Sequence, residues 1–360
     1  MSDLRYMDLA LSLGARGLGR TWPNPSVGCV IVADGRIVGR GTTQRGGRPH
    51  AEREALDQAG EAARGATAYV TLEPCAHTGK TPPCADALVA AGIARAVVAC
   101  TDPDPRTAGR GVEILRAGGV EVTLGLREAE ARAAHAGFLK RIEQGLPAVT
   151  LKLASTLDGR IATSTGQSRW ITGPMARRLV HGMRARHDAV MVGAGTARAD
   201  DPALDVRDVG DVQQPVRVVL SRDLNLPING RLAQTARHQP LWLIHGPDAD
   251  TRDWARTGAT LIEVPIRDHL IDTTAALRAL AARGLTTVLC EGGGHLAASL
   301  IHFGLVDELV TMQAGCLIGS DGLPSLAGLG VRDIADAPRF RLIETRTVGS
   351  DILSRWRPAD

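Results

Sequence analysis

The stretch Leu72–Cys84, "LEPCAHTGKTPPC", decides how the first half of the chain is interpreted. Its two cysteines, Cys75 and Cys84, stand nine positions apart, and a Pro-Pro pair directly precedes the second. An apolar run with strand character, "ATAYVTLE", leads into the segment, and a helical pattern, "CADALVAAG", follows it. Such a pair can form a disulfide loop, a redox couple or half of a metal site. The remainder of the chain distinguishes between these three.

Composition and compartment argue against a disulfide. The 360 residues are 44% hydrophobic and 22% charged, which is ordinary for a globular chain of two domains. The N-terminal "MSDLRYMDLALSLGARGLGR" predicts an amphipathic helix rather than a targeting signal. Apolar runs stay below the roughly 18–20 residues that a membrane span needs. We therefore expect a cytoplasmic protein without a membrane partner, where stable disulfides are rare.

The net charge indicates the kind of partner, and the other four cysteines show why Cys75 and Cys84 stand out. A net charge of +3 with dispersed arginines lacks the clustered basic stripe of nucleic-acid-binding proteins, so we expect a small-molecule partner instead. Four cysteines lie in apolar strand-like runs such as "VGCVIV" and "RAVVAC", which indicates small buried hydrophobes. Those four are Cys29, Cys100, Cys290 and Cys316. Only Cys75 and Cys84 lie in polar, proline-rich surroundings.

A third metal ligand is offered by "PHAERE", where His50 stands 25 positions before Cys75. One imidazole and two thiolates suit Zn²⁺, and three protein ligands leave the fourth tetrahedral position for water, as a catalytic site requires. Glu52 is not needed as a ligand and can carry a proton from the attacking water to a leaving amine. This is the zinc deaminase pattern H-x-E with P-C-x-x-C, here with the second cysteine delayed to Cys84.

Two alternatives share this pattern. A purely structural zinc would need a fourth protein ligand, which His77 can supply, and the first domain would then be a binding module without chemistry. A nucleic-acid deaminase shares the zinc core, but the long Cys75–Cys84 spacing and the weak charge disfavour it.

Strand and helix patterns alternate through both halves of the chain, which predicts an α/β fold. "VGCVIVADGRIVG" consists of two apolar runs around Asp34-Gly35, a hairpin signal. "REAEARAAHAGFLKRIEQG" predicts one long helix ending at Gly145. "GLP" at 145–147 interrupts the pattern and a new strand follows at once. We therefore place the domain boundary there, with domains over 1–145 and 146–360.

Six separated motifs give the sequence a resemblance to a known family. They are "PNPSVGCVIV", "PHAE" and "TLEPCAHTGKTPPCADAL" in the first half, and "KLASTLDGRIATSTGQSRWITG", "GAGTARADDPALDVR" and "VLCEGGGHLAASLIHFGLVDEL" in the second. In this order, over nearly the whole chain, they resemble the bifunctional riboflavin-biosynthesis deaminase–reductases.

The resemblance implies a cytidine-deaminase-like α/β/α domain followed by a dihydrofolate-reductase-like α/β domain. The first would be a zinc-dependent deaminase that converts a diaminopyrimidinone carrying a phosphoribosylamino chain into the uracil. The second would be an NADPH-dependent reductase that opens the ribosyl group to a ribityl chain. The implied cofactors are one Zn²⁺ per chain and NADPH. The oligomeric state stays open, a homo-oligomer included.

Site residues follow from the resemblance by motif position. In the first domain it makes His50, Cys75 and Cys84 the zinc ligands and Glu52 the proton shuttle. The residues placed on the two substrates are Asn24, His77, Lys80, Ser168, Arg184, Leu204, Arg207 and Glu291. The residues placed on the cofactor are Ala154, Trp170, Thr196, Asp200, Gly293, Gly294, His295, Leu296, Ala297, Ala298 and Ser299.

The residue types fit these implied roles. In "EGGGHLAAS", glycines precede a helix whose N-terminus offers N–H groups to phosphate, but the spacing is not that of a Rossmann fingerprint. Arg184 and Arg207 suit phosphate as clamps, and Lys80 suits it as a point charge. A degenerate second domain is disfavoured by the retained Glu291, Arg207 and Asp200.

Two positions depart from the family pattern. Thr43 stands where the family commonly carries a His that contacts substrate, so that contact is in doubt. Arg222 follows the strand "PVRVVLS", where the family often has Ser or Thr. A guanidinium there is a candidate for binding the adenosine 2′-phosphate of NADPH bidentately. We therefore add Arg222 to the cofactor residues.

Overall fold

The computed structural model describes residues 2–78, 82–210 and 212–359. Its contacts divide the chain into two compact units, Met1–Leu146 and Pro147–Asp360. No helix in the described part of the chain has the length and apolar character that crossing a bilayer requires. Both units combine helices with a partly parallel sheet, which confirms the predicted α/β class.

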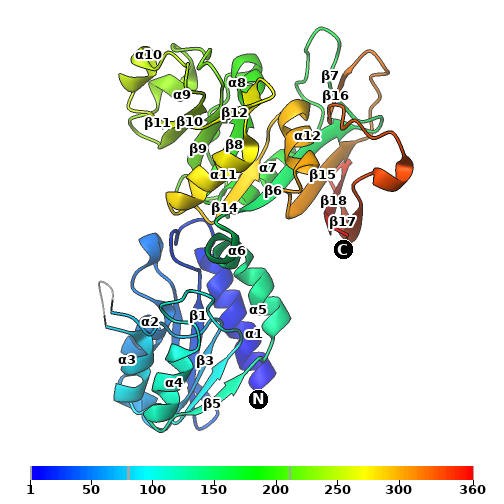
Figure 1. Ribbon diagram of the computed structural model, residues 1–360. Coiled ribbons are helices and arrows are strands. Elements are labelled where there is room, and N and C mark those ends of the chain that lie inside the picture. The colour runs from blue at the N-terminus through cyan, green and yellow to red at the C-terminus, as the bar shows by residue number, and fades with distance from the viewer. Residues whose placement is uncertain (1, 79–81, 211, 360) are drawn as a thin grey trace. The chain divides into compact units, whose positions relative to one another are not determined.

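The first unit is built on a five-stranded sheet in the order β2-β1-β3-β4-β5. Its strands are β1 (Gly28–Ala33), β2 (Arg36–Thr42), β3 (Thr67–Val70), β4 (Arg95–Val98) and β5 (Glu121–Leu124). β1 runs antiparallel to β2 and β3, whereas β3, β4 and β5 are parallel. The helices are α1 (Asp3–Gly14), α2 (Ala51–Ala59), α3 (Cys84–Ala90), α4 (Arg110–Ala117), α5 (Glu128–Ala134) and α6 (Ala136–Gln144). Figure 1 shows α2, α3 and α4 on one side of this sheet and α1 and α5 on the other.

Tight packing of α2 against β2 sets the position of the helix that carries Glu52. A Cβ at Gly39 would lie 2.1 Å from the Ala55 carbonyl oxygen, and one at Gly41 would lie 2.0 Å from that of Ala51. Only glycine permits such an approach of backbone to backbone. The predicted hairpin is confirmed, with Asp34 and Gly35 at φ 49° and 73° in its two-residue turn.

The prediction of one long helix ending at Gly145 is wrong, because α5 ends at Ala134 and α6 begins at Ala136. The residue between them, His135, is 3% exposed and places its Nε2 3.1 Å from Thr71 Oγ1. That contact lies 64 positions away in sequence, so the helical pattern alone carries no sign of it. Buried polar atoms are usually hydrogen-bonded, and this contact forms at the residue where the chain turns between α5 and α6.

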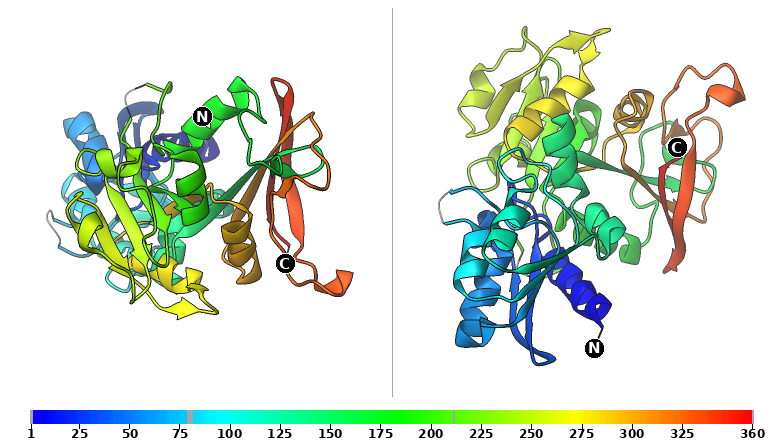
Figure 2. Two further views of the ribbon diagram at one scale, coloured as in Figure 1. Left: turned by 90° about the horizontal axis from the view of Figure 1, so that it is seen from above. Right: turned by 60° about the horizontal axis from the view of Figure 1, so that its bottom comes forward.

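The second unit is built on a nine-stranded sheet in the order β11-β10-β9-β8-β14-β6-β15-β18-β17, parallel from β11 to β15. Its strands are β6 (Ala148–Thr156), β8 (Ala189–Gly193), β9 (Val216–Leu220), β10 (Leu241–His245), β11 (Thr260–Glu263), β14 (Thr287–Cys290), β15 (Glu308–Ala314), β17 (Phe340–Val348) and β18 (Asp351–Pro358). Two small ladders pair β7 (Arg160–Ala162) with β16 (Leu323–Pro324), and β12 (Ile266–Arg267) with β13 (Leu270–Ile271). The antiparallel hairpin β17–β18 forms one edge of the large sheet (Figure 2).

The helices of the second unit are α7 (Pro174–Arg184), α8 (Ala194–Asp200), α9 (Arg231–Gln234), α10 (Arg252–Ala255), α11 (Thr273–Ala282) and α12 (Gly294–His302). The neighbouring parallel strands β8 and β14 lead directly into the N-termini of α8 and α12. Ligands of open α/β sheets bind at the carboxyl ends of such strands. The connections after β8 and β14 are therefore the place to look for a site.

Candidate functional site

Three side chains converge at the carboxyl end of β3 in the first unit. His50 Nδ1 lies 3.3 Å from Cys84 Sγ and 3.6 Å from Cys75 Sγ, and the three ligand atoms all lie within 4.8 Å of one another. His50 immediately precedes α2, and Cys84 is the first residue of α3, so two helix starts and one loop supply the set. Three residues that the sequence separates by 25 and 9 positions thus form one cluster.

The geometry of this cluster fits a zinc ion. Tetrahedral Zn²⁺ holds sulfur at about 2.3 Å and nitrogen at about 2.0 Å, which places a nitrogen ligand about 3.5 Å from a sulfur ligand. The two observed nitrogen–sulfur separations bracket that value. His77, the candidate fourth ligand, is not part of the cluster among the described residues, and its Nδ1 lies 3.4 Å from Thr107 Oγ1. Three ligands favour a catalytic zinc over a structural one.

The electrostatics of the cluster suit proton transfer. The hydrogen bond from the Cys84 side chain, together with those from His50 and the Cys84 backbone, holds the pKa of Cys75 well below its usual range. Burial and the adjacent Cys75 sulfur raise the pKa of Glu52 to about 7. The Oε2 atom of Glu52 is buried without a hydrogen-bond partner within the described structure. An unpaired carboxylate oxygen beside a metal-ligand set can exchange a proton with a bound reactant.

A pocket opens above the cluster, and several predicted residues line it. Asn24, His50, Glu52, Cys75 and His77 all contribute to its wall. Lys80 lies outside the described residues.

Thr43, noted above as a departure from the pattern that the resemblance implies, also lines the pocket. It is 3% exposed, and its Oγ1 accepts a hydrogen bond from the Val27 backbone. The hydroxyl is therefore used to join the segment before β1 to the one after β2.

The pocket also contains acidic residues that the sequence interpretation missed. Asp102 and Asp104 line it from the segment after β4, and burial raises the pKa of Asp102 to about 6. The Glu73 carboxylate accepts hydrogen bonds from the backbone N–H groups of Asp102, Gly109 and Val112, which fixes this segment. The signal in the sequence was "TDPDPR", a polar, proline-rich turn directly after a parallel strand, like the "EPC" turn after β3.

In the second unit, Arg184 of α7 and Glu291, just after β14, form a buried ion pair. Nε lies 2.6 Å from Oε1 and Nη2 lies 2.9 Å from Oε2, while the side chains are 13% and 9% exposed. Arg184 Nη1 also donates to the Asp205 carbonyl at 2.8 Å. Most of the Arg184 guanidinium is therefore occupied by protein groups. Burial lowers the pKa of the nearby Lys152, and the Glu291 carboxylate opposes that change.

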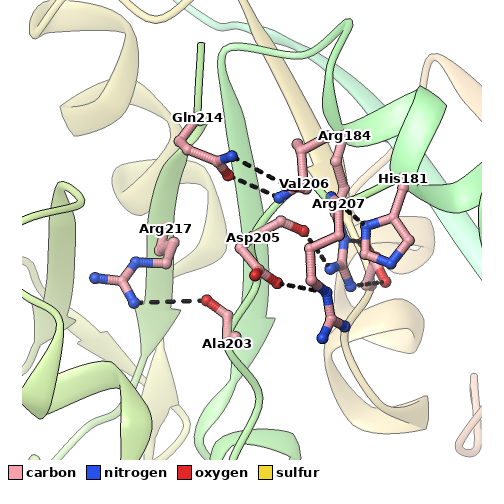
Figure 3. Close-up of polar contacts among 9 residues, drawn as sticks. His181, Arg184, Ala203, Asp205, Val206, Arg207, Gln214 and Arg217 are labelled. Carbon is pink, nitrogen blue, oxygen red and sulfur yellow. Dashed lines mark hydrogen bonds and ion pairs between the residues drawn. The ribbon is translucent and has the colours of Figure 1, made fainter. Parts of the chain in front are cut away.

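The Arg207 guanidinium, near the Arg184–Glu291 pair, is more exposed than that of Arg184. Its side chain is 59% exposed, with Nε 3.4 Å from Asp205 Oδ1, and its backbone N–H donates to His181 Nδ1 at 3.2 Å. Figure 3 shows Arg207, His181 and Arg184 close together. Leu204, three residues before Arg207, has a buried side chain and a φ of 54°. Ser168 is half-buried in the loop between β7 and α7.

The predicted cofactor residues converge only in part. Thr196 Oγ1 in α8 accepts a hydrogen bond from the Gly293 backbone at 3.1 Å, which joins the two helix starts that follow β8 and β14. Gly294, His295 and Leu296 open α12, where backbone N–H groups lack intrahelical partners and can meet phosphate. Ala297 is fully buried, Ala298 is nearly so, and Ser299 Oγ lies 3.1 Å from Thr273 Oγ1 in α11. The side chains of these last three therefore serve the packing of α12.

The other predicted cofactor residues lie on separate elements. Trp170 is 69% exposed, and the Arg177 guanidinium stacks 4.5 Å from its ring centroid. Asp200 ends α8, and its carbonyl accepts from Arg169. Ala154 lies on β6 opposite Met312 of β15. Arg222, after β9, donates to the His269 carbonyl in the turn between β12 and β13 at 3.0 Å.

Comparison with known families gives one match for each unit. Residues 1–100 match the cytidine and deoxycytidylate deaminase zinc-binding region, and residues 147–354 match the RibD C-terminal domain. The second match alone covers more than half of the chain. The first unit is thus a cytidine-deaminase domain, and the second has the fold of the RibD C-terminal domain.

Full-length relatives and solved structures agree. The riboflavin biosynthesis protein RibD of Escherichia coli K12 is 45% identical, with 98% of each chain covered, and that of Aquifex aeolicus is 41% identical, with 98% and 97% covered. The structure of RibD from Acinetobacter baumannii (form 1) has a TM-score of 0.90 at 40% identity, with 99% of each chain covered. A Thermotoga maritima structure, described as a diaminohydroxyphosphoribosylaminopyrimidine deaminase and phosphoribosylaminouracil reductase, has a TM-score of 0.86 at 35% identity, covering 99% of this chain and 98% of that one.

Proposed function

Because the chain belongs to the RibD family of riboflavin biosynthesis proteins, we propose that its two reactions are divided between residues 1–145, which deaminate, and residues 146–360, which reduce. The chain is a bifunctional deaminase and reductase. The substrate we assign to the first reaction is a diaminopyrimidinone with a phosphoribosylamino chain. The product, a phosphoribosylaminouracil, is the substrate of the second reaction.

The observation that carries the deaminase assignment is the unpaired Oε2 atom of Glu52 beside the His50, Cys75 and Cys84 cluster. These three residues are the proposed ligands of one Zn²⁺ per chain, which when bound supplies Lewis-acid activation of water. Glu52, with its pKa near 7, accepts a proton from the attacking water and returns it to the leaving amine. The raised pKa brings uptake and release of a proton by this carboxyl closer to neutral pH.

Residues around the pocket hold the pyrimidine during this transfer. We assign Asn24 and His77 to the substrate, together with Lys80, which lies outside the described residues. The Asn24 side-chain amide nitrogen donates to the Gly47 carbonyl at 2.8 Å, and this bond does not use the side-chain oxygen. An amide fixed in this way can accept a hydrogen bond from a ring amine without reorganising.

For the reduction we propose NADPH as hydride donor, bound at the starts of α8 and α12. Thr196 and Gly293 join these starts, and the free N–H groups of the first turn of α12 suit the cofactor phosphates. The other proposed cofactor contacts are Ala154, Trp170, Asp200, Arg222 and residues 294–299.

The substrate of the reductase is assigned to Ser168, Leu204, Arg207 and the Arg184–Glu291 pair. Arg207 keeps an exposed guanidinium and is the proposed partner of the substrate phosphate. Arg184 is engaged with Glu291 and the Asp205 carbonyl, so we assign it to holding Glu291 toward the ribosyl group. The substrate is a small molecule; the absence of nucleic-acid and membrane partners, the cytoplasmic location and any homo-oligomer remain predictions.

A coupled assay with the purified full chain tests the function. We expect ammonia release from the diaminopyrimidinone without NADPH, and NADPH oxidation only after deamination. Elemental analysis should find about one zinc per chain, lost in Cys75→Ser and in Cys84→Ser. Active protein without metal would refute the deaminase mechanism. NADPH oxidation with the diaminopyrimidinone as the only substrate, by a chain that releases no ammonia from it, would refute the order of the two steps.

A further inference from the structure

The segment 201–207 carries Leu204 and Arg207 but forms neither helix nor strand. Side chains from other parts of the second unit bind its backbone instead. Arg184 donates to the Asp205 carbonyl, and His181 accepts from the Arg207 N–H. Buried backbone groups outside a sheet need such partners, and each one that is supplied restricts the path of the segment.

The Gln214 side chain hydrogen-bonds both the N–H and the carbonyl group of one residue of the segment, Val206. Its Oε1 accepts from the Val206 N–H at 2.7 Å, and its Nε2 donates to the Val206 carbonyl at 3.0 Å, as Figure 3 shows. The amide therefore takes the place of a neighbouring strand over one residue. The Val206 side chain is 6% exposed, so this residue is fixed on its apolar side as well.

Arg217 holds the segment from β9. It is fully buried, its Nη1 lies 3.5 Å from the Ala203 carbonyl, and its guanidinium also donates to Thr235 Oγ1 and the Gln239 carbonyl at 2.6 and 2.7 Å. Burial lowers the pKa of Arg217 to about 10, and the nearby Asp205 carboxylate opposes that change. Arg217 and Gln214 thus hold the segment on either side of Leu204.

The backbone conformation of Leu204 indicates that contacts with the rest of the unit fix the segment 201–207. Its φ of 54° lies in the left-handed region, which residues other than glycine rarely adopt. Such a conformation persists only where the surroundings determine it. With Leu204 in this conformation, Arg207 follows three residues later with its guanidinium exposed.

We propose that Gln214 is a positioning residue of the reductase site. By fixing both backbone groups of Val206, it directs the neighbouring Arg207 guanidinium toward the phosphate of the reductase substrate. The inference rests on the proposed function, in which Arg207 binds that phosphate. Gln214 itself touches neither substrate nor cofactor in this arrangement; it acts through Arg207.

The test measures steady-state reduction of the deaminated phosphoribosylaminouracil by NADPH with the full chain. Gln214→Ala should raise KM for that substrate about tenfold, the order expected for two lost hydrogen bonds, with kcat and the NADPH KM unchanged within about twofold. Gln214→Glu keeps the shape but offers no donor to the Val206 carbonyl, so KM should rise even if the alanine variant folds poorly. The matched control is Gln213→Ala, since the Gln213 Oε1 has no hydrogen-bond partner in the described structure; its KM should stay unchanged.

A double-mutant cycle with Arg207→Ala separates positioning from a general loss of packing. If Gln214 acts through Arg207, adding Gln214→Ala to Arg207→Ala should raise KM no further than about twofold. If Gln214→Ala raises KM in the Arg207→Ala background as much as it does in the unmodified chain, the inference about Gln214 is wrong. It is also wrong if Gln214→Glu has a normal KM while Arg207→Ala has a raised one. Either result leaves the assignment of Arg207 to the phosphate intact. An unchanged KM in Arg207→Ala removes Arg207 from the phosphate site and overturns that assignment together with the inference.

Discussion

Arg184 and Glu291 form a bidentate ion pair although 107 positions separate them, with Nε–Oε1 and Nη2–Oε2 distances of 2.6 and 2.9 Å. Burial opposes ionisation of Glu291, but the charge and hydrogen bonds of Arg184 outweigh it, so the pKa of Glu291 is lowered. Removing either partner would leave a largely buried charge without its hydrogen-bonded counterion. The pair thus ties α7 to the end of β14 and favours the ionised form of Glu291 at the proposed reductase site.

The two activities should be separable by mutation, since the zinc cluster and the Arg184–Glu291 pair lie in different units. Glu291→Ala should stop NADPH oxidation while ammonia release continues, and Cys75→Ser should stop ammonia release while pre-deaminated substrate is still reduced. Thermal melts of both variants control for unfolding of one unit by damage in the other. A well-folded Cys75→Ser protein that cannot reduce the deaminated intermediate would mean one composite site.

Glu52→Gln should retain zinc, because Glu52 is not among the proposed ligands, and should lose deamination by a factor on the order of 10²–10⁴. The amide cannot accept the proton that the carboxylate, with its pKa of about 7, takes up. Zinc content and ammonia release are measured on the same preparation, with Glu54→Gln, in the same first turn of α2, as the control. Normal deamination by Glu52→Gln would assign the proton transfer to another group.

Arg222→Ala should reduce the preference for NADPH over NADH. The Arg222 guanidinium uses one nitrogen on the His269 carbonyl, and its other N–H groups can meet the 2′-phosphate that only NADPH carries. Steady-state kinetics with both cofactors give the ratio of kcat/KM values. Arg256→Ala, an exposed arginine paired with Asp253, serves as the control and should leave the ratio unchanged. The same ratio in Arg222→Ala as in the unmodified chain would remove Arg222 from the cofactor site.

His135 should make the stability of the protein fall on acidification. Burial lowers its pKa to about 4 in the folded state, whereas the pKa of an unfolded histidine is about 6.5. Between these values the unfolded chain binds a proton that the folded chain does not, so stability decreases as pH falls, by up to about 3 kcal/mol from this residue. At higher pH the effect is absent, because His135 is neutral in both states.

The measurement compares urea unfolding of the unmodified chain and His135→Gln from pH 7.5 to pH 4.5. The amide can still reach the Thr71 hydroxyl but does not titrate. Its stability should therefore depend less on pH, and the difference between the two proteins should shrink or reverse toward acid. Parallel pH dependences would show that His135 contributes nothing to the acid sensitivity.

The sequence by itself determined the features whose signals are local or have fixed spacing. The turn at Asp34-Gly35 is decided by two residues that accept positive φ, and the structure has it where the sequence predicts it. The ligand set His50, Cys75 and Cys84 can be predicted from the sequence, because each residue stands at a helix start or after a strand and these elements are themselves predictable. The α/β class follows from the alternation of strand and helix patterns for the same reason.

Only the tertiary structure decided the features that depend on contacts between distant segments. The break between α5 and α6 lies at His135, whose ring contacts the distant Thr71, and Asp102 reaches the pocket from a backbone that is hydrogen-bonded to the Glu73 carboxylate. Gln214 looks like an ordinary loop residue until its amide is seen on both backbone groups of Val206. Such roles are set by where a side chain ends after folding, and neither periodicity nor motif spacing encodes that position.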